Sequence, residues 1–308
     1  MNFSNNMEKS FYSKVLLFGE YSVIKDSMAL SIPYPLFEGK LLFQRNKSSY
    51  IDPELKAIFR YLSNLEQKYD GEFFLDITSL DFDIGQGLFF DSTIPQGYGV
   101  GSSGALCAAL FDRYGINPHE YNIAGLKNIF SQIESHFHGK SSGVDPLISY
   151  LNSPLLKTEN GDLLTVTTPD FSQKGDGGAI FLLNTTRPRR TEPLVNLFLE
   201  KCKNKEFDNL MSSVLAPINN RCINSFLEAD IASLYEFFRE LSDFQRRYFL
   251  PMIPNLYQDL WIDGLKSEEF YLKLCGAGGG GFLLGMSKDF TKARSRLKGH
   301  EIRPLFFF

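Results

Sequence analysis

The stretch that decides the fold starts at Pro95 and reads Pro95-Gln96-Gly97-Tyr98-Gly99-Val100-Gly101-Ser102-Ser103-Gly104. It leads directly into residues 105–114, a run of good helix formers that ends before Gly115. Glycines let a backbone approach an anion closely, and the free N–H groups at a helix start favour negative charge. The pattern therefore predicts a phosphate-binding loop, and a plain glycine turn with a serine N-cap is the alternative. It is not a Walker A loop, which needs a lysine before the hydroxyl, and its spacing does not fit a Rossmann fingerprint.

A second glycine cluster lies near the C-terminus. Four of the 25 glycines fall between residues 97 and 104, and six fall between residues 276 and 285. The second group, 276–281, is flanked by apolar segments on both sides. A flexible hairpin tip does not need two apolar flanks, so we expect close backbone packing here.

Two acidic residues provide candidate chemistry. Glu134 and Asp145 are 145 − 134 = 11 positions apart, one ending a helical pattern and one following a glycine break. A kinase site needs one carboxylate for Mg²⁺ and one near the attacking hydroxyl. A pair of capping or surface acids is the alternative interpretation. His136 and His138 do not share a helix face, so we do not expect them to bind zinc together.

Composition excludes several classes of protein. The chain has 308 residues, 43% hydrophobic and 22% charged, with 29 Phe and 14 Tyr, which is enough for a large core and for two domains. No run approaches the ~18–20 apolar residues of a membrane span, and the first residues lack a signal-peptide pattern, so we expect a cytoplasmic protein. A net charge of −4 does not favour nucleic acid. Four cysteines without C-x-x-C pairing predict neither disulfides nor structural zinc.

Mixed strand and helix patterns without regular alternation predict an α+β fold. A composition shift at 169–178 predicts a boundary between domains 1–174 and 175–308. We expect strands at 14–18, 21–24, 73–90, 179–183, 270–274, 282–286 and 305–308, and helices at 53–68, 105–114, 123–137, 144–148 and, with breaks near Pro217 and Pro251–Pro254, 192–265.

The ordered set of motifs resembles the superfamily of galactokinase, homoserine kinase, mevalonate kinase and phosphomevalonate kinase, the GHMP kinases. Their phosphate loop, P-x-G-x-G-L-G-S-S-A, is similar to residues 95–104, with Val100 replacing Leu and Gly104 replacing Ala. Their G-A-G-G-G-G motif is matched by 276–281, with Cys275 where Thr is common.

Three further segments resemble the mevalonate kinase branch of this superfamily. They are Lys14–Tyr21 (K-V-L-L-F-G-E-Y), Glu134–Asp145, and Asn184–Thr191 (N-T-T-R-P-R-R-T). The chain departs from that branch at Tyr12-Ser13, which replace Pro-Gly, at Tyr21, which replaces His, and at Leu106, which replaces an aromatic residue.

The resemblance implies a two-domain GHMP kinase fold, ribosomal protein S5 domain 2-like at the N-terminus and a ferredoxin-like α/β sandwich at the C-terminus. It implies that Asp145 takes the proton of the substrate hydroxyl, with Lys14 beside it, and that Ser103 and Glu134 hold Mg²⁺. The ATP phosphates would be bound by Pro95, Gly97, Gly99, Gly101, Ser102, Ser103 and Gly104. Glu20, Tyr21 and Thr191 would lie near the acceptor, and Gly276, Gly278, Gly279 and Gly280 would form the structural glycine motif.

The implied function is ATP- and Mg²⁺-dependent phosphorylation of the 5-hydroxyl of (R)-mevalonate by a monomer or homodimer. A phosphomevalonate kinase, or a kinase of a sugar or amino-acid alcohol, is the alternative, because Lys140, Arg187, Arg189 and Arg190 could bind an extra phosphate. The related decarboxylase is disfavoured by the 138–145 stretch. A non-catalytic ligand sensor is a remote alternative, because Lys14, Ser103 and Asp145 are all present.

Overall fold

The computed structural model describes residues 9–44, 51–69, 71–171, 177–189 and 191–308. The chain divides into two compact units, each built from separate stretches. The first unit consists of Met1–Lys14, Pro33–Pro95 and Val100–Ser153, and the second of Val15–Ile32, Gln96–Gly99 and Pro154–Phe308. The predicted boundary between residues 174 and 175 falls within 172–176, outside the described residues, so the division into 1–174 and 175–308 stays a prediction.

Among the described residues of the first unit, five α-helices accompany a pair of antiparallel strands. The end of β2 (Ala29–Phe43) pairs with β3 (Leu88–Ser92), with Gly39 opposite Ser92 and Phe43 opposite Leu88. The helices are α1 (Pro53–Glu66), α2 (Ile77–Gly85), α3 (Ser102–Tyr114), α4 (Ile123–His138) and α5 (Val144–Leu151).

Helices α3, α4 and α5 share one aromatic core. The rings of Phe111, Phe130 and Tyr150, one from each helix, have centroids 5.3–5.5 Å apart. Tilted and edge-to-face aromatic contacts of this kind stabilise a core beyond their buried area alone. The N-terminal ends of α3 and α5 carry the phosphate loop and Asp145, so this core fixes the elements on which those residues lie.

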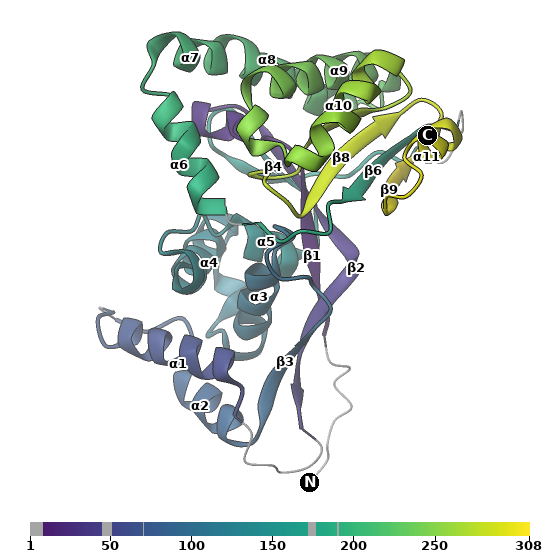
Figure 1. Ribbon diagram of the computed structural model, residues 1–308. Helices are drawn as coiled ribbons and strands as arrows, with labels where there is room; N and C mark the ends of the chain where they lie inside the picture. Colours follow the sequence, from purple (N-terminus) through teal and green to yellow (C-terminus); the bar gives the residue numbers. More distant parts are fainter. Residues whose placement is uncertain (1–8, 45–50, 70, 172–176, 190) are drawn as a thin grey trace. The chain divides into compact units, whose positions relative to one another are not determined.

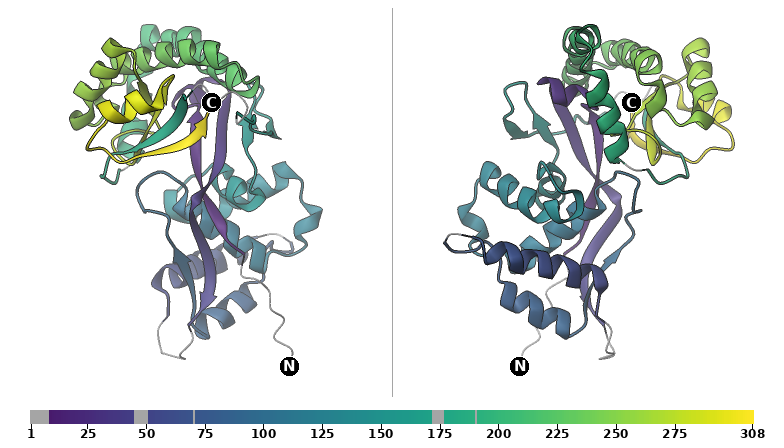
Figure 2. Two further views of the ribbon diagram at one scale, coloured as in Figure 1. Left: turned by 90° about the vertical axis from the view of Figure 1, so that its right-hand side faces the viewer. Right: turned by 60° about the vertical axis from the view of Figure 1, so that its left-hand side comes forward.

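The second unit contains a four-stranded antiparallel sheet in the order β7-β8-β6-β9. Leu182 of β6 pairs with Leu284 of β8 on one side and with Arg303 of β9 on the other. Helices α9 and α10 pack over β7 and β8 (Figures 1 and 2). The strands are β6 (Ala179–Asn184), β7 (Tyr271–Leu274), β8 (Phe282–Ser287) and β9 (Ile302–Phe307), and the helices are α6 (Thr191–Lys201), α7 (Lys205–Leu210), α8 (Ala216–Leu227), α9 (Ile231–Tyr248), α10 (Asn255–Ser267) and α11 (Phe290–Arg296).

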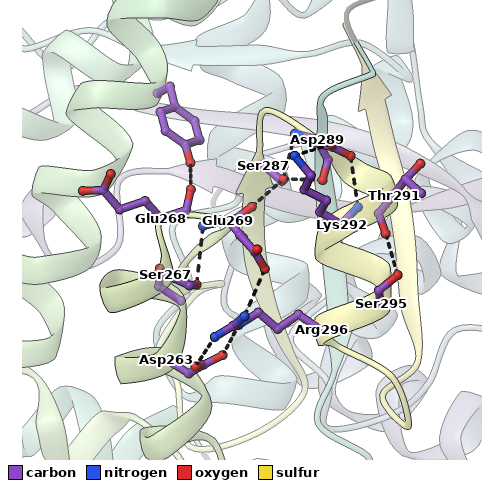
Figure 3. A network of polar contacts seen from close by, with 12 residues as sticks. Asp263, Ser267, Glu268, Glu269, Ser287, Asp289, Thr291, Lys292, Ser295 and Arg296 are labelled. Carbon is purple, nitrogen blue, oxygen red and sulfur yellow. Dashed lines mark hydrogen bonds and ion pairs between the residues drawn. The ribbon is translucent and has the colours of Figure 1, made fainter.

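Two smaller features complete this unit. Strand β4 (Leu155–Lys157) pairs with β5 (Leu163–Thr165) and with the start of β2, and β1 (Phe11–Phe18) contributes residues to both units. Arg296 of α11 donates to both carboxylate oxygens of Asp263 at 2.7 and 2.9 Å and contacts Glu269 at 3.3 Å, which joins α11 to α10 (Figure 3).

The α+β class is confirmed, with antiparallel sheets and many helices. The extended prediction for residues 73–90 is wrong over half of its length, where α2 occupies Ile77–Gly85, and is confirmed at its end, where β3 begins at Leu88. The side chain of Asp76 caps this helix by accepting from the Ser79 N–H at 2.9 Å. The strand predicted at 21–24 is also wrong: a 3₁₀ helix spans Ser22–Lys25.

Two further outcomes concern the C-terminal half. The helical path continues through Pro217, since the π-helical residues Met211–Leu215 run directly into α8, whose second residue is Pro217. The final residues form the predicted strand: β9 pairs with β6, and Phe308 is buried. In the described part of the chain no helix is long and apolar enough to cross a membrane.

Candidate active site

Lys14 and Asp145 form an ion pair in the first unit. Lys14 Nζ lies 2.9 Å from Asp145 Oδ2, with the lysine side chain 10% exposed and the aspartate side chain 37% exposed. The Lys14 N–H donates to the Val100 carbonyl at 2.9 Å, which ties β1 to the phosphate loop. A largely buried cation thus lies beside a carboxylate that remains open to a substrate.

The backbone around Asp145 explains its position. Asp145 lies in the first turn of α5, after Gly143, whose φ of +73° starts the helix in a left-handed conformation. A Cβ at Gly143 would meet the Lys127 carbonyl and the Ser131 N–H of α4, so only glycine fits there. A Cβ at Gly104 would lie 3.0 Å from the Asp145 carbonyl carbon. Helices α3 and α5 therefore approach more closely than the alanine of the family motif would allow.

A cluster of oxygens surrounds Glu134 in the same unit. Ser103 Oγ donates to Glu134 Oε1 at 3.1 Å, and Ser141 Oγ donates to Glu134 Oε2. Ser103 Oγ also lies 3.2 Å from His138 Nε2. Because a hydroxyl has one proton, Ser103 donates to the carboxylate and accepts from the Nε2–H of His138. Each carboxylate oxygen of Glu134 therefore has a hydroxyl donor.

The electrostatic environment of Glu134 is unusual. Burial, together with the negative charge of Asp145, raises the pKa of Glu134 to about 7, against the lowering effect of the hydrogen bonds from Ser141 and Ser103 and of the charge of Lys14. A carboxylate in such a setting gains from any cation brought beside it. The described residues contain no group of three or more His, Cys, Asp or Glu suited to a metal, but Mg²⁺ commonly uses only one or two carboxylates together with substrate phosphates.

In the second unit, Arg189 passes between two glycines of the predicted motifs. A Cβ at Gly99 would overlap the Arg189 guanidinium, and a Cβ at Gly276 would lie 2.5 Å from Arg189 Nη2. Arg189 Nη1 donates to the Cys275 carbonyl at 2.6 Å, and the Arg189 N–H donates to the Gly97 carbonyl at 2.8 Å. These two glycines make room for an arginine as well as giving the loops conformational freedom.

Glu20 and Lys273 form a buried ion pair. Lys273 Nζ lies 2.5 Å from Glu20 Oε1, and the side chains are 0% and 1% exposed respectively. The same glutamate oxygen accepts from the Gly276 N–H at 3.4 Å, and Lys273 Nζ also donates to the Leu274 carbonyl at 2.7 Å. Burial raises the pKa of Glu20, against the lowering effect of Lys273. Glu20 thus holds the start of the glycine motif.

Tyr21 is also buried and bonded within the second unit. Its hydroxyl donates to the Ala277 carbonyl at 2.6 Å, and its ring packs on Phe198 and Phe249. Burial raises the pKa of Tyr21 well above its usual value. Where the mevalonate kinase motif has a histidine, this chain has Tyr21, whose hydroxyl is hydrogen-bonded to the glycine motif.

The glycine motif 276–281 packs closely against its neighbours. Gly276, Gly278, Gly279, Gly280 and Gly281 all have positive φ. The Gly279 N–H donates to the Met252 carbonyl and the Gly281 N–H donates to the Arg187 carbonyl, each at 2.7 Å. A Cβ at Gly280 would lie 2.6 Å from the Arg187 carbonyl. This segment is a tightly held turn.

The remaining predicted residues are placed as follows. Pro95 and Ser102 are half-buried in the first unit, with Ser102 the first residue of α3. Thr191 begins α6, and its side chain lies outside the described residues, as does Arg190. Sequence reasoning overlooked Lys273 and Ser141 as partners of predicted site residues. The signal that could have indicated them is their position in the sequence: Lys273 lies just before the glycine motif 276–281, and Ser141 lies within the 134–145 segment.

The fold and these motifs are similar to those of GHMP kinases. Residues 56–153 match the family model described as GHMP kinases N terminal domain, and the chain carries that domain, so the predicted resemblance is confirmed. The chain is similar to the mevalonate kinase of Dictyostelium discoideum, which is 26% identical over 230 residues, 65% of this chain and 57% of that protein. The chain thus spans little more than half the length of this relative.

Solved structures share the whole fold. The mevalonate kinase of Methanococcus jannaschii has a TM-score of 0.63 and 18% identity over 98% of both chains. The L. major mevalonate kinase in complex with R-mevalonate has a TM-score of 0.64 and 17% identity over 96% of this chain and 91% of that one. The Streptococcus pneumoniae phosphomevalonate kinase with phosphomevalonate and AMPPNP has a TM-score of 0.66 and 12% identity over 97% and 100%. The predicted GHMP kinase fold is confirmed.

Proposed function

We propose that this protein is an ATP- and Mg²⁺-dependent kinase that phosphorylates the 5-hydroxyl of (R)-mevalonate. The observation that carries the proposal is the Lys14–Asp145 ion pair, at 2.9 Å, in the same compact unit as the Ser103–Glu134 pair. The mevalonate kinase relative supports the choice of acceptor.

In the proposed reaction, Asp145 accepts the proton of the attacking hydroxyl. The alcohol oxygen then forms a bond to the γ-phosphorus of ATP, the bond from that phosphorus to the β,γ-bridging oxygen breaks, and ADP leaves. Lys14 keeps Asp145 oriented and places positive charge beside the transferring group. Such a site works through positioning and electrostatic stabilisation, and proton transfer contributes about 10²–10⁴-fold.

The residues of the first unit fit a magnesium ion. Ser103 Oγ and Glu134 Oε1 are hard oxygen atoms 3.1 Å apart at the start of α3 and near the end of α4. We assign them as the protein ligands, with phosphate oxygens completing the coordination. A bound Mg²⁺ would neutralise phosphate charge and would place a cation directly beside the buried carboxylate of Glu134.

The loop 95–104 is assigned to the ATP phosphates. Its last glycine before the helix, Gly101, has a φ of +84° and starts α3 without a side-chain cap, which leaves the first N–H groups of the helix open to an anion. Glu20, Tyr21 and Thr191 are assigned to the acceptor side through the family motifs. The buried bonds of Glu20 and Tyr21 favour an indirect role for both, through the glycine motif.

Another acceptor alcohol is the alternative, since this fold is also that of phosphomevalonate kinase and of galactokinase. The specific observation in its favour is Tyr21, buried where the mevalonate kinase motif has histidine. A monomer or homodimer that acts in the cytoplasm completes the proposal.

The test is a coupled ADP-release assay against mevalonate, phosphomevalonate, homoserine, galactose and shikimate. We expect mevalonate to give the highest kcat/KM. Turnover of another alcohol with none of mevalonate would overturn the acceptor, and turnover of no alcohol would overturn the kinase assignment.

A further inference from the structure

Ser141 lies in the short loop between α4 and α5 and makes hydrogen bonds in three directions. Its hydroxyl donates to Glu134 Oε2 and accepts from the Gly143 N–H at 3.0 Å. Its carbonyl accepts from the Ser131 hydroxyl at 2.6 Å. All four residues belong to the first unit. One hydroxyl therefore connects a buried carboxylate to the backbone that starts the next helix.

Both ends of this connection carry proposed chemistry. Glu134 is 4% exposed, and its other oxygen faces the hydroxyl of Ser103. Gly143 is the N-cap of α5, and Asp145 follows two residues later. A shift of the Ser141 hydroxyl would thus move the metal carboxylate, the catalytic helix or both.

The neighbouring serine does not make this connection. Ser142, which occupies the serine position of the family pattern H-G-x-x-S-G-x-D at residues 138–145, has its hydroxyl 3.4 Å from the Val144 N–H and is exposed, whereas Ser141 is half-buried. The motif leaves position 141 unspecified. Sequence comparison with the motif therefore gives no reason to single out Ser141, whereas the geometry does.

We propose that Ser141 is a positioning residue, which fixes the rotamer of Glu134 for metal binding and holds it in register with the helix that carries Asp145. This rests on the proposed function, because it takes Glu134 as a ligand of Mg²⁺. Hydrogen bonds that orient a ligating carboxylate are worth about 10–100-fold in metal affinity in well-studied sites.

The test compares Ser141→Ala with two other variants of the full chain. Ser141→Thr keeps a hydroxyl at the same position. Ser135→Ala is the matched control, because Ser135 lies on the same helix as Glu134 and donates only to the Ser131 carbonyl at 2.7 Å. The readout is Mn²⁺ binding to the protein–ATP complex, followed by electron paramagnetic resonance of free Mn²⁺, with ATP binding in EDTA measured separately.

We expect Ser141→Ala to weaken Mn²⁺ binding by about tenfold or more while leaving metal-free ATP binding unchanged. Ser141→Thr should restore most of the affinity, and Ser135→Ala should bind Mn²⁺ like the wild type. Wild-type Mn²⁺ affinity in Ser141→Ala, or an equal loss of ATP affinity in EDTA, would overturn the proposal. Failure of the wild type to phosphorylate any alcohol would instead overturn the proposed function, and the Mn²⁺ comparison does not depend on that assay.

Discussion

Gly104→Ala restores the alanine of the family motif and should nevertheless harm this protein. Replacing glycine by alanine inside a helix stabilises by up to about 1 kcal/mol in the absence of strain. At Gly104, however, the new Cβ would lie 3.0 Å from both the Asp145 carbonyl carbon and the Pro146 nitrogen. These are backbone atoms at the start of α5, which cannot rotate away, and overpacking of this kind costs about 1–3 kcal/mol.

Gly125→Ala provides the matched control. Gly125 is the third residue of α4 as Gly104 is of α3, but its Cβ would meet only ordinary contacts at 3.4–3.5 Å. We therefore expect Gly125→Ala to leave the free energy of unfolding unchanged or to raise it. The free energy of unfolding of Gly104→Ala should be lower than that of Gly125→Ala by about 1–3 kcal/mol.

The same displacement should reduce catalysis. Because Asp145 lies at the point of contact, a shift of a few tenths of an ångström should lower kcat about three- to tenfold, since a 1 Å misplacement can cost about 10²-fold. Urea denaturation measures the stability difference, and steady-state kinetics measures kcat for both variants. If Gly104→Ala matched Gly125→Ala in stability and kept wild-type kcat, the close approach of α3 and α5 would be refuted.

Three further predictions concern the second unit. Lys273→Met leaves Glu20 buried without its partner and should lower the free energy of unfolding by about 3–5 kcal/mol in urea titrations, whereas a loss below 1 kcal/mol would contradict the buried pair. Gly99→Ala should be more destabilising than Gly161→Ala by about 1–3 kcal/mol, because both have positive φ but only the first would overlap a pinned guanidinium; equal losses would argue against that contact. Hydrogen bonds from its arginine partner lower the pKa of Asp263 below 3.8, so the stabilising contribution of this carboxylate is present above that pH and is lost as the pH falls through the lowered pKa. The stability advantage of the wild type over Asp263→Asn should be at most about 1 kcal/mol at pH 7 for so exposed a pair, and it should shrink as acid protonates the carboxylate. An advantage that did not change as the pH fell would refute this.

The sequence predicts best those features that are local. The glycine and serine pattern at 97–104, the helix after it and the acidic residues at either end of 134–145 are each recognisable within a dozen residues. Loop and helix-start chemistry depends on neighbours in the chain, so these features can be predicted from pattern alone. The contact of Lys14 with Asp145 followed only from the family resemblance, because a lone lysine at a strand start carries no signal of its own.

Features that depend on distant contacts could not be predicted in this way. Glu20 and Lys273 are 253 positions apart, and nothing in the glycine motif indicates that an arginine passes beside Gly99 and Gly276. Helix α2 was missed for a local reason, since buried Ile77, Leu80 and Ile84 have helical spacing but were interpreted as a strand. Its aspartate N-cap was the overlooked signal.

Phosphorus-31 NMR of a reaction with ATP, Mg²⁺ and (R)-mevalonate shows directly whether the phosphoryl group is transferred to the alcohol. For the wild type we expect ADP and one new phosphomonoester signal in equal amounts. Asp145→Asn should form the ester slower by orders of magnitude while its nucleotide affinity is largely kept. Near-normal ester formation by Asp145→Asn would contradict the role of Asp145 as the base, and release of inorganic phosphate without any ester would contradict the proposed kinase activity itself.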